Sequence, residues 1–503
     1  MMCGCHRIVL GVAATVTLLS SPCGPLAAEK SSPGSQPARR SPEWLKQATI
    51  YQVWPRSFSR EGTLKAVTAR LPYIADLGAS IVYLTPINRM STDPRPEHWS
   101  QRMRWSPSTR SSECKNPYRI ADYDAIDPEF GTEEDLRELV DSAHKVGLKV
   151  MMDIVFFHCG PDSVLLERPG FVKRTADGKP VLGRWGFPAL NYESSELRDY
   201  LIGVLVHWVR DVKVDGFRCD VAGAVPIDFW EAARVALDKV NPEVIMLSEA
   251  DSPSHLLKAF DISYNFPYYY SALEPAMRSG ESATLIRTHW ERMQAAFPVG
   301  AKFLHFSGHH GRDPADVVFG VDGAAATAVL NFTIDGIPCV FNGQEFGDAT
   351  LNDIMAKVPI RFDLAEVNRA ELRTAGGAPR LAFYKQLFEL RGREPALTSG
   401  ELVWLDSDAA DDVVAFLRKH GDDEILVAVN LRNVKRKVSL TPPRDGVYAS
   451  ILPNPGPYNK GGISPKSWSP AQGPLALGAL DFFVGKKATA AEPATAGPPA
   501  PRQ

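Results

Sequence analysis

The sequence lacks an excess of charge of either sign. It has 56 Lys and Arg residues against 59 Asp and Glu residues, a formal net charge of −3 over 503 residues. A chain with this balance has no basic footprint for nucleic acid or for an anionic membrane surface. We therefore expect neither nucleic acid nor a membrane to be a partner of the mature protein.

Long hydrophobic runs are also scarce, apart from one near the N-terminus. Residues 8–19 form that run, behind a weakly basic start and ahead of the small residues Ala27 and Ala28. The run is too short to span a bilayer, and the arrangement is typical of a secretory signal peptide, with an uncleaved anchor as the alternative. We expect residues 1–29 to be removed on export, which places the protein in the periplasm or the medium.

Cysteines with the spacing of a metal site are absent. After the signal, the sequence retains Cys114, Cys159, Cys219 and Cys339, none of which forms a C-x-x-C pair. This spacing gives no indication of a zinc site, and we expect no bound metal. Export permits a disulfide, and Cys114 with Cys159 is the expected pair because both lie in predicted loops.

The middle of the chain contains eight short apolar segments, most of them followed by a helical pattern. The predicted strands are residues 50–54, 80–85, 149–156, 214–221, 244–248, 262–264, 302–306 and 337–341, and the clearest predicted helices are 64–77, 133–145, 197–212, 228–240 and 378–390. Apolar strands that alternate with helices predict a parallel sheet covered by helices. Eight such units predict an α/β fold, a closed (β/α)8 TIM barrel.

The pattern changes after residue 390 to short alternating segments, which predict a C-terminal antiparallel β-sandwich. The expected organisation is a signal peptide (1–29), a solvated linker (30–44), a barrel (45–395) with a short insertion after its third strand (about 159–193), the β-sandwich (396–486) and a disordered tail (487–503).

Acidic side chains stand where three predicted barrel strands end. Asp153 lies on the third strand, Asp220 at the end of the fourth, and Glu249 directly after the fifth. A charged group at such a position is costly to desolvate unless it is paired or hydrated. One such group alone is equally well explained as a structural ion pair. Several that converge on one rim of a barrel indicate a site, because barrel enzymes build their sites at the carboxyl ends of the strands.

Asp220 and Glu249 lie one strand–helix unit apart, so adjacent strands present both carboxyl groups. Retaining glycosidases hold two carboxyl groups about 5–5.5 Å apart, one as the nucleophile and the other as the acid and then the base. Arg218, two residues before Asp220, projects to the same face of the strand and is expected to keep Asp220 ionised. The spacing alone is a moderate indication of a glycosidase.

Five segments resemble the alpha-amylase family, glycoside hydrolase family 13. They are Ile50–Phe58, the stretch from Asp76 to Ile87, Asp122–Thr132, Gly216–Ala222 and Ile337–Glu345. The resemblance extends from about residue 45 to about residue 395, and a family-like C-terminal sandwich follows it.

The resemblance implies a role for each of several residues. Asp220 would be the nucleophile, Glu249 the general acid and base, and Arg218 the residue that orients Asp220. The implied sugar contacts are His158, Tyr118 beneath the reacting sugar and His310 after the seventh strand, with Trp185 as a further candidate in the insertion. Asp153 would support the site from behind.

Three positions depart from the family pattern. Phe157 stands where the family usually has an asparagine that often ligates a structural calcium, and Arg119 stands where an aspartate is common. We therefore expect no cofactor and no calcium at the usual site. Gly311 occupies the place of the family's third catalytic carboxylate, and Asp313, two residues further on, is the candidate substitute.

Histidine offers no metal site either. His305, His309 and His310 have no ligand spacing, and on a strand His309 and His310 would face opposite sides.

Three functions stay open. The first is an alpha-amylase-type retaining glycosidase that cleaves α-glucosidic bonds of starch-like glucans or maltooligosaccharides. The second is a transglycosidase or isomerase that uses the same site. The third is a weak or inactive family member that binds glucans or a partner, which Phe157, Arg119 and Gly311 together motivate.

Overall fold

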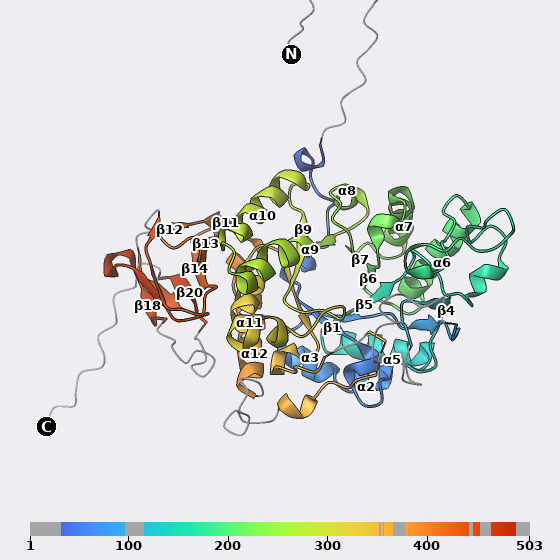
Figure 1. The fold of residues 1–503 in the computed structure, drawn as a ribbon, viewed down its shortest axis with the longest axis horizontal. Helices are drawn as coiled ribbons and strands as arrows, with labels where there is room; N and C mark the ends of the chain where they lie inside the picture. The colour runs from blue at the N-terminus through green and yellow to red at the C-terminus, as the bar shows by residue number, and fades with distance from the viewer. Residues whose placement is uncertain are drawn as a thin grey trace, which may run out of the picture.

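Eight parallel strands close into a barrel at the centre of the molecule (Figure 1). The computed structural model describes residues 32–95, 115–351, 354–355, 357–365, 378–441, 446–452 and 464–488. The barrel strands are β1 (Ile50–Val53), β2 (Ile81–Leu84), β5 (Lys149–Ile154), β6 (Gly216–Cys219), β7 (Ile245–Ser248), β8 (Ile262–Tyr264), β9 (Lys302–Phe306) and β10 (Ile337–Phe341). Closure occurs where β10 pairs with β1, with Cys339 opposite Ile50. The predicted TIM barrel is confirmed.

Helices cover the outside of the barrel. The main ones are α2 (Leu64–Thr68), α3 (Leu71–Leu77), α5 (Glu133–Lys145), α6 (Ser195–Arg210), α7 (Ile227–Val240), α10 (Thr284–Ala296), α11 (Ala315–Thr333) and α12 (Ala378–Arg393). Shorter helices are α1 (Pro55–Phe58), α8 (His255–Lys258), α9 (Phe266–Tyr268) and α13 (Pro395–Ser399). Thr132 caps α5 in a reciprocal capping box with Asp135, as its sequence predicts. The helix predicted over 64–77 is two helices, because Pro72 cannot donate a helical hydrogen bond and instead sits in the first turn of α3.

Helix α11 is long and apolar enough to cross a membrane by length and composition. Most of it is buried inside the protein, where it contacts β9 and β10 on one side and β14 of the C-terminal domain on the other. Its apolar character is therefore that of a core helix.

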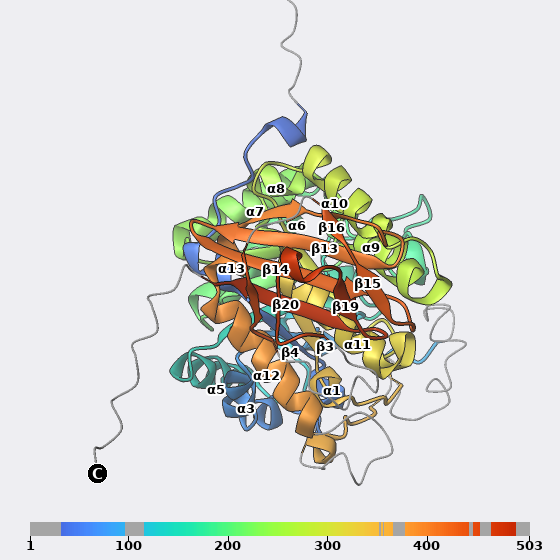
Figure 2. The ribbon, with the colours of Figure 1, turned by 90° about the vertical axis from the view of Figure 1, so that its left-hand side faces the viewer.

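The C-terminal domain is antiparallel and lies against α10, α11 and α13 (Figures 1 and 2). Its main sheet has the order β11 (Glu401–Trp404), β13 (Val413–His420), β14 (Asp423–Asn430), β20 (Phe482–Lys487), β17 (Tyr448–Ser450) and β18 (Ser467–Trp468). Alternate residues face opposite sides: Phe416 and Val427 join the barrel core, whereas Leu417 and Leu426 join a second core. Two small sheets cover that second core, β12 (Asp406–Ser407) with β16 (Leu440–Thr441), and β15 (Arg436–Val438) with β19 (Leu475–Leu477).

Two long connections project from the carboxyl end of the barrel. After β2 comes an antiparallel pair, β3 (Asn88–Met90) with β4 (Ile120–Ile126), which sequence analysis missed because β3 is short and its register is interrupted. After β5 comes the insertion, residues 159–193. The insertion is held by isolated bridges, among them His158 with Ala189, and by short 3-10 turns.

Two local expectations need correction. Residues 30–44 were expected to be a solvated linker, but Arg39 anchors the described part, residues 32–44, to the barrel through Asp261 at 2.6 Å and Asp238 at 2.8 Å. Asp261 is buried and requires a charged partner, which explains why the segment stays on the surface of the barrel. The expected disulfide is the second: Cys159 is a free, buried thiol, and its expected partner Cys114 lies outside the described residues. The predicted signal peptide and the end of the tail, 489–503, lie outside them as well.

Candidate active site

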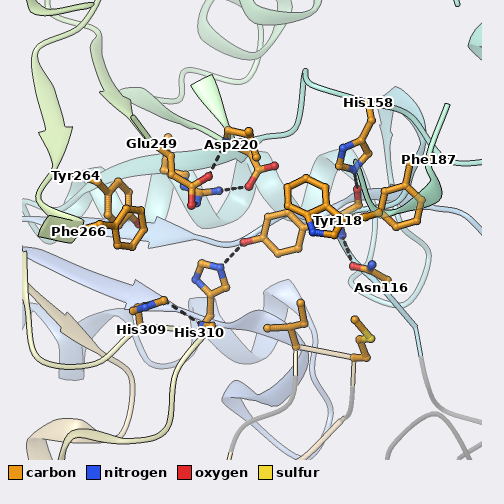
Figure 3. Close-up of a pocket in the computed structure, with 16 residues that line it drawn as sticks. Asn116, Tyr118, His158, Phe187, Asp220, Glu249, Tyr264, Phe266, His309 and His310 are labelled. Atoms are coloured by element: carbon orange, nitrogen blue, oxygen red, sulfur yellow. Dashed lines mark hydrogen bonds and ion pairs between the residues drawn. The ribbon is translucent and has the colours of Figure 1, made fainter. Parts of the chain in front are cut away.

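A cavity of about 260 Å³ opens at the carboxyl ends of the barrel strands (Figure 3). Its lining comes from β6 and β8, from segments just before β4 and just after β5, β6, β7 and β9, from the start of α9, from the insertion and from residues 354–355. The lining residues are Asn116, Tyr118, His158, Trp185, Phe187, Arg218, Asp220, Val221, Glu249, Tyr264, Phe266, His309, His310, Gly311, Ile354 and Met355. Both carboxylates and all four sugar-contact residues that the sequence indicated therefore line one cavity.

Arg218 is the centre of the site. Strand β6 carries its side chain into the barrel, where it is 1% exposed. Its Nη1 atom donates to Asp153 at 2.8 Å and to Asp220 at 2.7 Å, and its Nη2 atom lies 2.6 Å from Glu249. One guanidinium thus holds three carboxyl groups from three neighbouring strands.

Glu249 is bound through both of its oxygens. Oε1 faces Arg218, and Oε2 accepts the backbone N–H of Val221 at 2.7 Å. Val221 directly follows Asp220 and adopts a left-handed conformation with φ of 44°, which is rare for a β-branched residue. This turn aims the Val221 N–H at Glu249, so the backbone after the candidate nucleophile also fixes the candidate acid.

Burial and neighbouring charges shift the pKa of Asp220. Burial raises the pKa of Asp220 well above its usual range, and the negative charge of Glu249 raises it further, while Arg218 opposes both effects. The sequence led us to expect that Arg218 would keep Asp220 ionised. In the structure that guanidinium is shared among three carboxyl groups, so each receives only part of its stabilisation.

A chain of hydrogen bonds runs beneath the cavity from β1 to β5. Gln52 Nε2 lies 2.7 Å from His310 Nδ1, and His310 Nε2 lies 2.8 Å from the Tyr118 hydroxyl. The Tyr118 hydroxyl donates in turn to Asp153 at 3.0 Å. Because a hydroxyl has a single proton, His310 Nε2 must donate to Tyr118, which leaves Nδ1 as the acceptor of the Gln52 amide. Asp153 does not line the cavity, but it fixes both Arg218 and Tyr118.

His158 lines the cavity with a ring of which one nitrogen is hydrogen-bonded and the other is unpaired within the described part of the chain. Its Nε2 donates to the Tyr118 carbonyl at 2.9 Å, and burial lowers its pKa to about 4. Its Nδ1 atom is buried and has no partner among the described residues. With the proton on Nε2, Nδ1 is an acceptor that suits a sugar hydroxyl.

Among the described residues, no acidic side chain occupies the place of the family's third catalytic carboxylate. Gly311 lines the cavity, whereas Asp313 is exposed and is not among the lining residues. The structure therefore does not bring the candidate substitute to the site. The acidic side chains that reach the cavity from the described chain are Asp220 and Glu249.

His310 was expected at the site, but His309 was expected to face the opposite side. Both face the cavity, opposite Asp220 and Glu249 (Figure 3), because they lie on a turn after β9 and not on a strand. Other lining residues were not expected from the sequence. Tyr264 and Phe266 form the wall beside Glu249 (Figure 3). Tyr264 is the last residue of β8, and this position at a strand end could have predicted its place in the site. Phe266, Ile354 and Met355 belong to no sequence motif that could have predicted theirs.

The residues at the family's calcium position do not suit a cation. Calcium takes oxygen ligands, and Phe157 supplies a ring where the family has an amide oxygen. Arg119 places a permanent positive charge in the same region, 2% exposed. Among the described residues no group of three or more His, Cys, Asp or Glu side chains has the arrangement of a metal site.

Two carboxylates and an arginine at the carboxyl ends of a parallel barrel define a class of protein, the barrel proteins with a paired-carboxylate glycosidase site. The particular family follows from comparison with known proteins. The model of the alpha-amylase catalytic domain matches residues 52–168 and 182–376, and the model of the alpha-amylase C-terminal all-beta domain matches residues 404–468. The chain belongs to the alpha-amylase family.

Relatives and solved structures agree with this assignment. The chain is 26% identical over 440 residues to a cyclomaltodextrinase from a Bacillus species, a match that covers 77% of this chain and 73% of the relative. It is 27% identical over 458 residues to neopullulanase 2 of Thermoactinomyces vulgaris, covering 81% of this chain and 73% of the relative. A maltogenic alpha-amylase from Thermotoga neapolitana shares the fold with a TM-score of 0.72 at 24% identity, covering 88% of this chain and 99% of that structure.

Proposed function

We propose that the protein is a retaining glycosidase that hydrolyses α-glucosidic bonds of maltooligosaccharides and related α-glucans. The observation that carries the proposal is the placement of Asp220 and Glu249 on the two terminal nitrogens of Arg218, in one cavity. Relatives named cyclomaltodextrinase and neopullulanase support α-glucans as the substrate class.

The first step breaks the glycosidic bond. A carboxylate oxygen of Asp220 attacks the anomeric carbon, the bond from that carbon to the leaving oxygen breaks, and Glu249 transfers its proton to the leaving oxygen. Asp220 must be deprotonated for this step and Glu249 protonated. Burial raises the pKa of Asp220 in the free protein, which opposes the deprotonated form that the attack requires, while the Arg218 guanidinium favours that form.

The second step releases the sugar. Glu249 accepts a proton from water, the resulting hydroxide attacks the anomeric carbon, and the bond to Asp220 breaks, which restores both carboxyl groups. His158 Nδ1 accepts a sugar hydroxyl, and the ring of Tyr118 forms the wall beneath the sugar.

The test is product analysis with maltoheptaose, using wild type beside Asp220→Asn and Glu249→Gln. Hydrolysis predicts shorter maltooligosaccharides that both substitutions abolish. Addition of an excess of acceptor sugar distinguishes the rival activity: new, longer or rearranged products would identify a transglycosidase or isomerase on the same site.

One observation favours a second candidate, a family member that binds glucans with little or no turnover. Gly311 replaces a carboxylate that grips sugar hydroxyls in the transition state, and the described residues supply no substitute. Calorimetric binding of maltoheptaose without any product above the Asp220→Asn background would establish this candidate.

We also propose that the protein is exported, with residues 1–29 as the cleaved signal and without a membrane or nucleic-acid partner. The support is the signal-like pattern of those residues and the balanced charge. A relative from Bacillus subtilis is named an intracellular maltogenic amylase, so export would distinguish this chain from it. N-terminal sequencing of the mature protein from the periplasm or medium tests the proposal, and a protein that stays in the cytosol with residue 1 intact would refute it.

A further inference from the structure

The insertion contributes a wall of the active-site cavity and must be held in place. Trp185 and Phe187 come from the insertion and line the cavity beside His158. Trp185 is 36% exposed and adopts φ of 69°, a left-handed conformation that is costly for a non-glycine residue. Surrounding contacts must therefore stabilise the segment.

Phe157 supplies the first of these contacts. Its ring lies 6.0 Å from the Trp185 ring at 89°, an edge-to-face arrangement typical of aromatic pairs. The residue at the family's calcium position thus contacts the insertion through ring packing.

Arg119 supplies the second. Its Nη2 atom donates to Ser91 Oγ at 3.1 Å and to the Asp93 carbonyl at 3.0 Å, and its guanidinium carbon lies 5.9 Å from the centre of the Phe187 ring. One buried cation thereby joins the loop after β3 to the insertion. It performs with a side chain the task of a bridging metal ion, and its charge would repel such an ion.

His158 lies between the two aromatic residues of the insertion. Its ring is 4.7 Å from Phe187 and 5.8 Å from Trp185. With Nε2 fixed on the Tyr118 carbonyl, these rings determine where Nδ1 points. Tyr118 is adjacent to Arg119 in the chain, so the same contacts also restrain the wall beneath the sugar.

We propose that Arg119, Phe157 and Phe187 form a clasp that holds the insertion against the barrel without a divalent cation and positions His158 and Trp185 toward the substrate. Phe157 and Arg119, the two departures from the family pattern in this region, belong to one device. The effect on substrate rests on the proposed function, whereas the effect on the insertion does not.

The first test uses the purified protein with excess EDTA or excess calcium chloride. The clasp predicts a melting temperature unchanged within about 1 °C, whereas saturation of a stabilising calcium site would raise it by about 4 °C for a protein of this size. A loss of stability in EDTA that calcium restores would overturn the proposal.

The second test compares Phe157→Ala, Phe157→Tyr, Arg119→Ala and a control, Leu182→Ala, an exposed site in the same insertion. Limited proteolysis should cleave residues 159–193 faster in Phe157→Ala and Arg119→Ala than in wild type. Phe157→Tyr and the control should be cleaved at the rate of wild type. Maltoheptaose affinity, measured calorimetrically in a Glu249→Gln background, should fall about tenfold in Phe157→Ala and Arg119→Ala. In Phe157→Tyr it should equal the affinity of the protein with Phe157 intact.

These readouts separate the two proposals. Faster proteolysis in a protein that shows no turnover would support the clasp and count against the glycosidase. Unchanged proteolysis and unchanged affinity in Phe157→Ala and Arg119→Ala would refute the clasp, whatever the turnover of the wild type.

Discussion

The Nη2 atom of Arg218 lies 2.6 Å from Oε1 of Glu249. The other oxygen of Glu249 accepts the Val221 N–H, so the carboxyl group has no oxygen that is free of a protein partner in this state. Each oxygen has room for a second hydrogen bond, so a glycosidic oxygen can approach Glu249 while both contacts hold its carboxyl group in place. Arg218 therefore controls the geometry of both Asp220 and Glu249.

Replacement of Arg218 by Lys should reduce kcat/KM about hundredfold or more, because an ammonium keeps the charge but loses the fork that holds three carboxyl groups at once. Steady-state kinetics on maltoheptaose, with circular dichroism to verify folding, makes the measurement. A folded Arg218→Lys protein with the turnover of wild type would contradict the role given to the guanidinium.

Replacement of Gly311 by Asp should increase kcat about tenfold or more. The new carboxylate would stand where the family holds sugar hydroxyls in the transition state, and a charge-assisted hydrogen bond of about 1.5–3 kcal/mol corresponds to that gain. Gly311→Asn controls for size without charge. Asp313→Asn should leave activity unchanged because Asp313 is exposed and outside the cavity. Loss of activity in Asp313→Asn would show that Asp313 reaches the substrate after all.

His158 should bind substrate only in its neutral form. Its pKa is lowered to about 4 by burial, so Nδ1 remains an acceptor at neutral pH and becomes a donor only in strong acid. His158→Ala should reduce kcat/KM about tenfold at neutral pH through loss of this hydrogen bond. Two results would show instead that the ring acts as a cation. One is a rise in kcat/KM in His158→Ala. The other is a fall in the kcat/KM of wild type below about the ordinary pKa of histidine that is absent from the pH profile of His158→Ala.

Glu345 should make the protein less stable as the pH rises toward neutrality. The carboxyl group is fully buried, accepts the hydroxyls of Tyr51 at 2.6 Å and Tyr73 at 2.9 Å, and has its pKa raised by burial to about 7. The folded state thus holds a proton that the unfolded chain releases near pH 4.5, so the free energy of unfolding falls between about pH 4.5 and 7, by about 3 kcal/mol.

Glu345→Gln removes this ionisation, and its unfolding free energy relative to wild type should rise over the same pH range. Urea unfolding at several pH values gives both curves. Parallel curves for the two proteins would mean that Glu345 does not titrate in this range.

Much of this architecture was predictable from short-range patterns. The apolar strand segments and the capping box at Thr132 are local signals, and they gave the barrel and the start of α5 correctly. Asp220, Glu249 and Arg218 were also accessible, because strand ends of a parallel barrel meet at one rim.

The remainder depends on contacts between distant segments. Nothing local to Arg39 indicates its buried partner Asp261, and nothing local to Phe157 indicates the Trp185 ring. The raised pKa of Asp220 likewise depends on its burial and on the nearby charge of Glu249, neither of which a local pattern reveals. The placement of His309 and His310 on one wall depended on a turn that the sequence pattern presented as the end of a strand.

The most direct test of the central claim is release of sugar from maltoheptaose by residues 30–503, with Asp220→Asn as the control. The account predicts release by the wild type and its loss, by a factor of about 1,000 or more, in Asp220→Asn, because the amide of asparagine cannot replace the carboxylate that attacks the anomeric carbon. Equal release by the two proteins, or none by either on any α-glucoside, would contradict it.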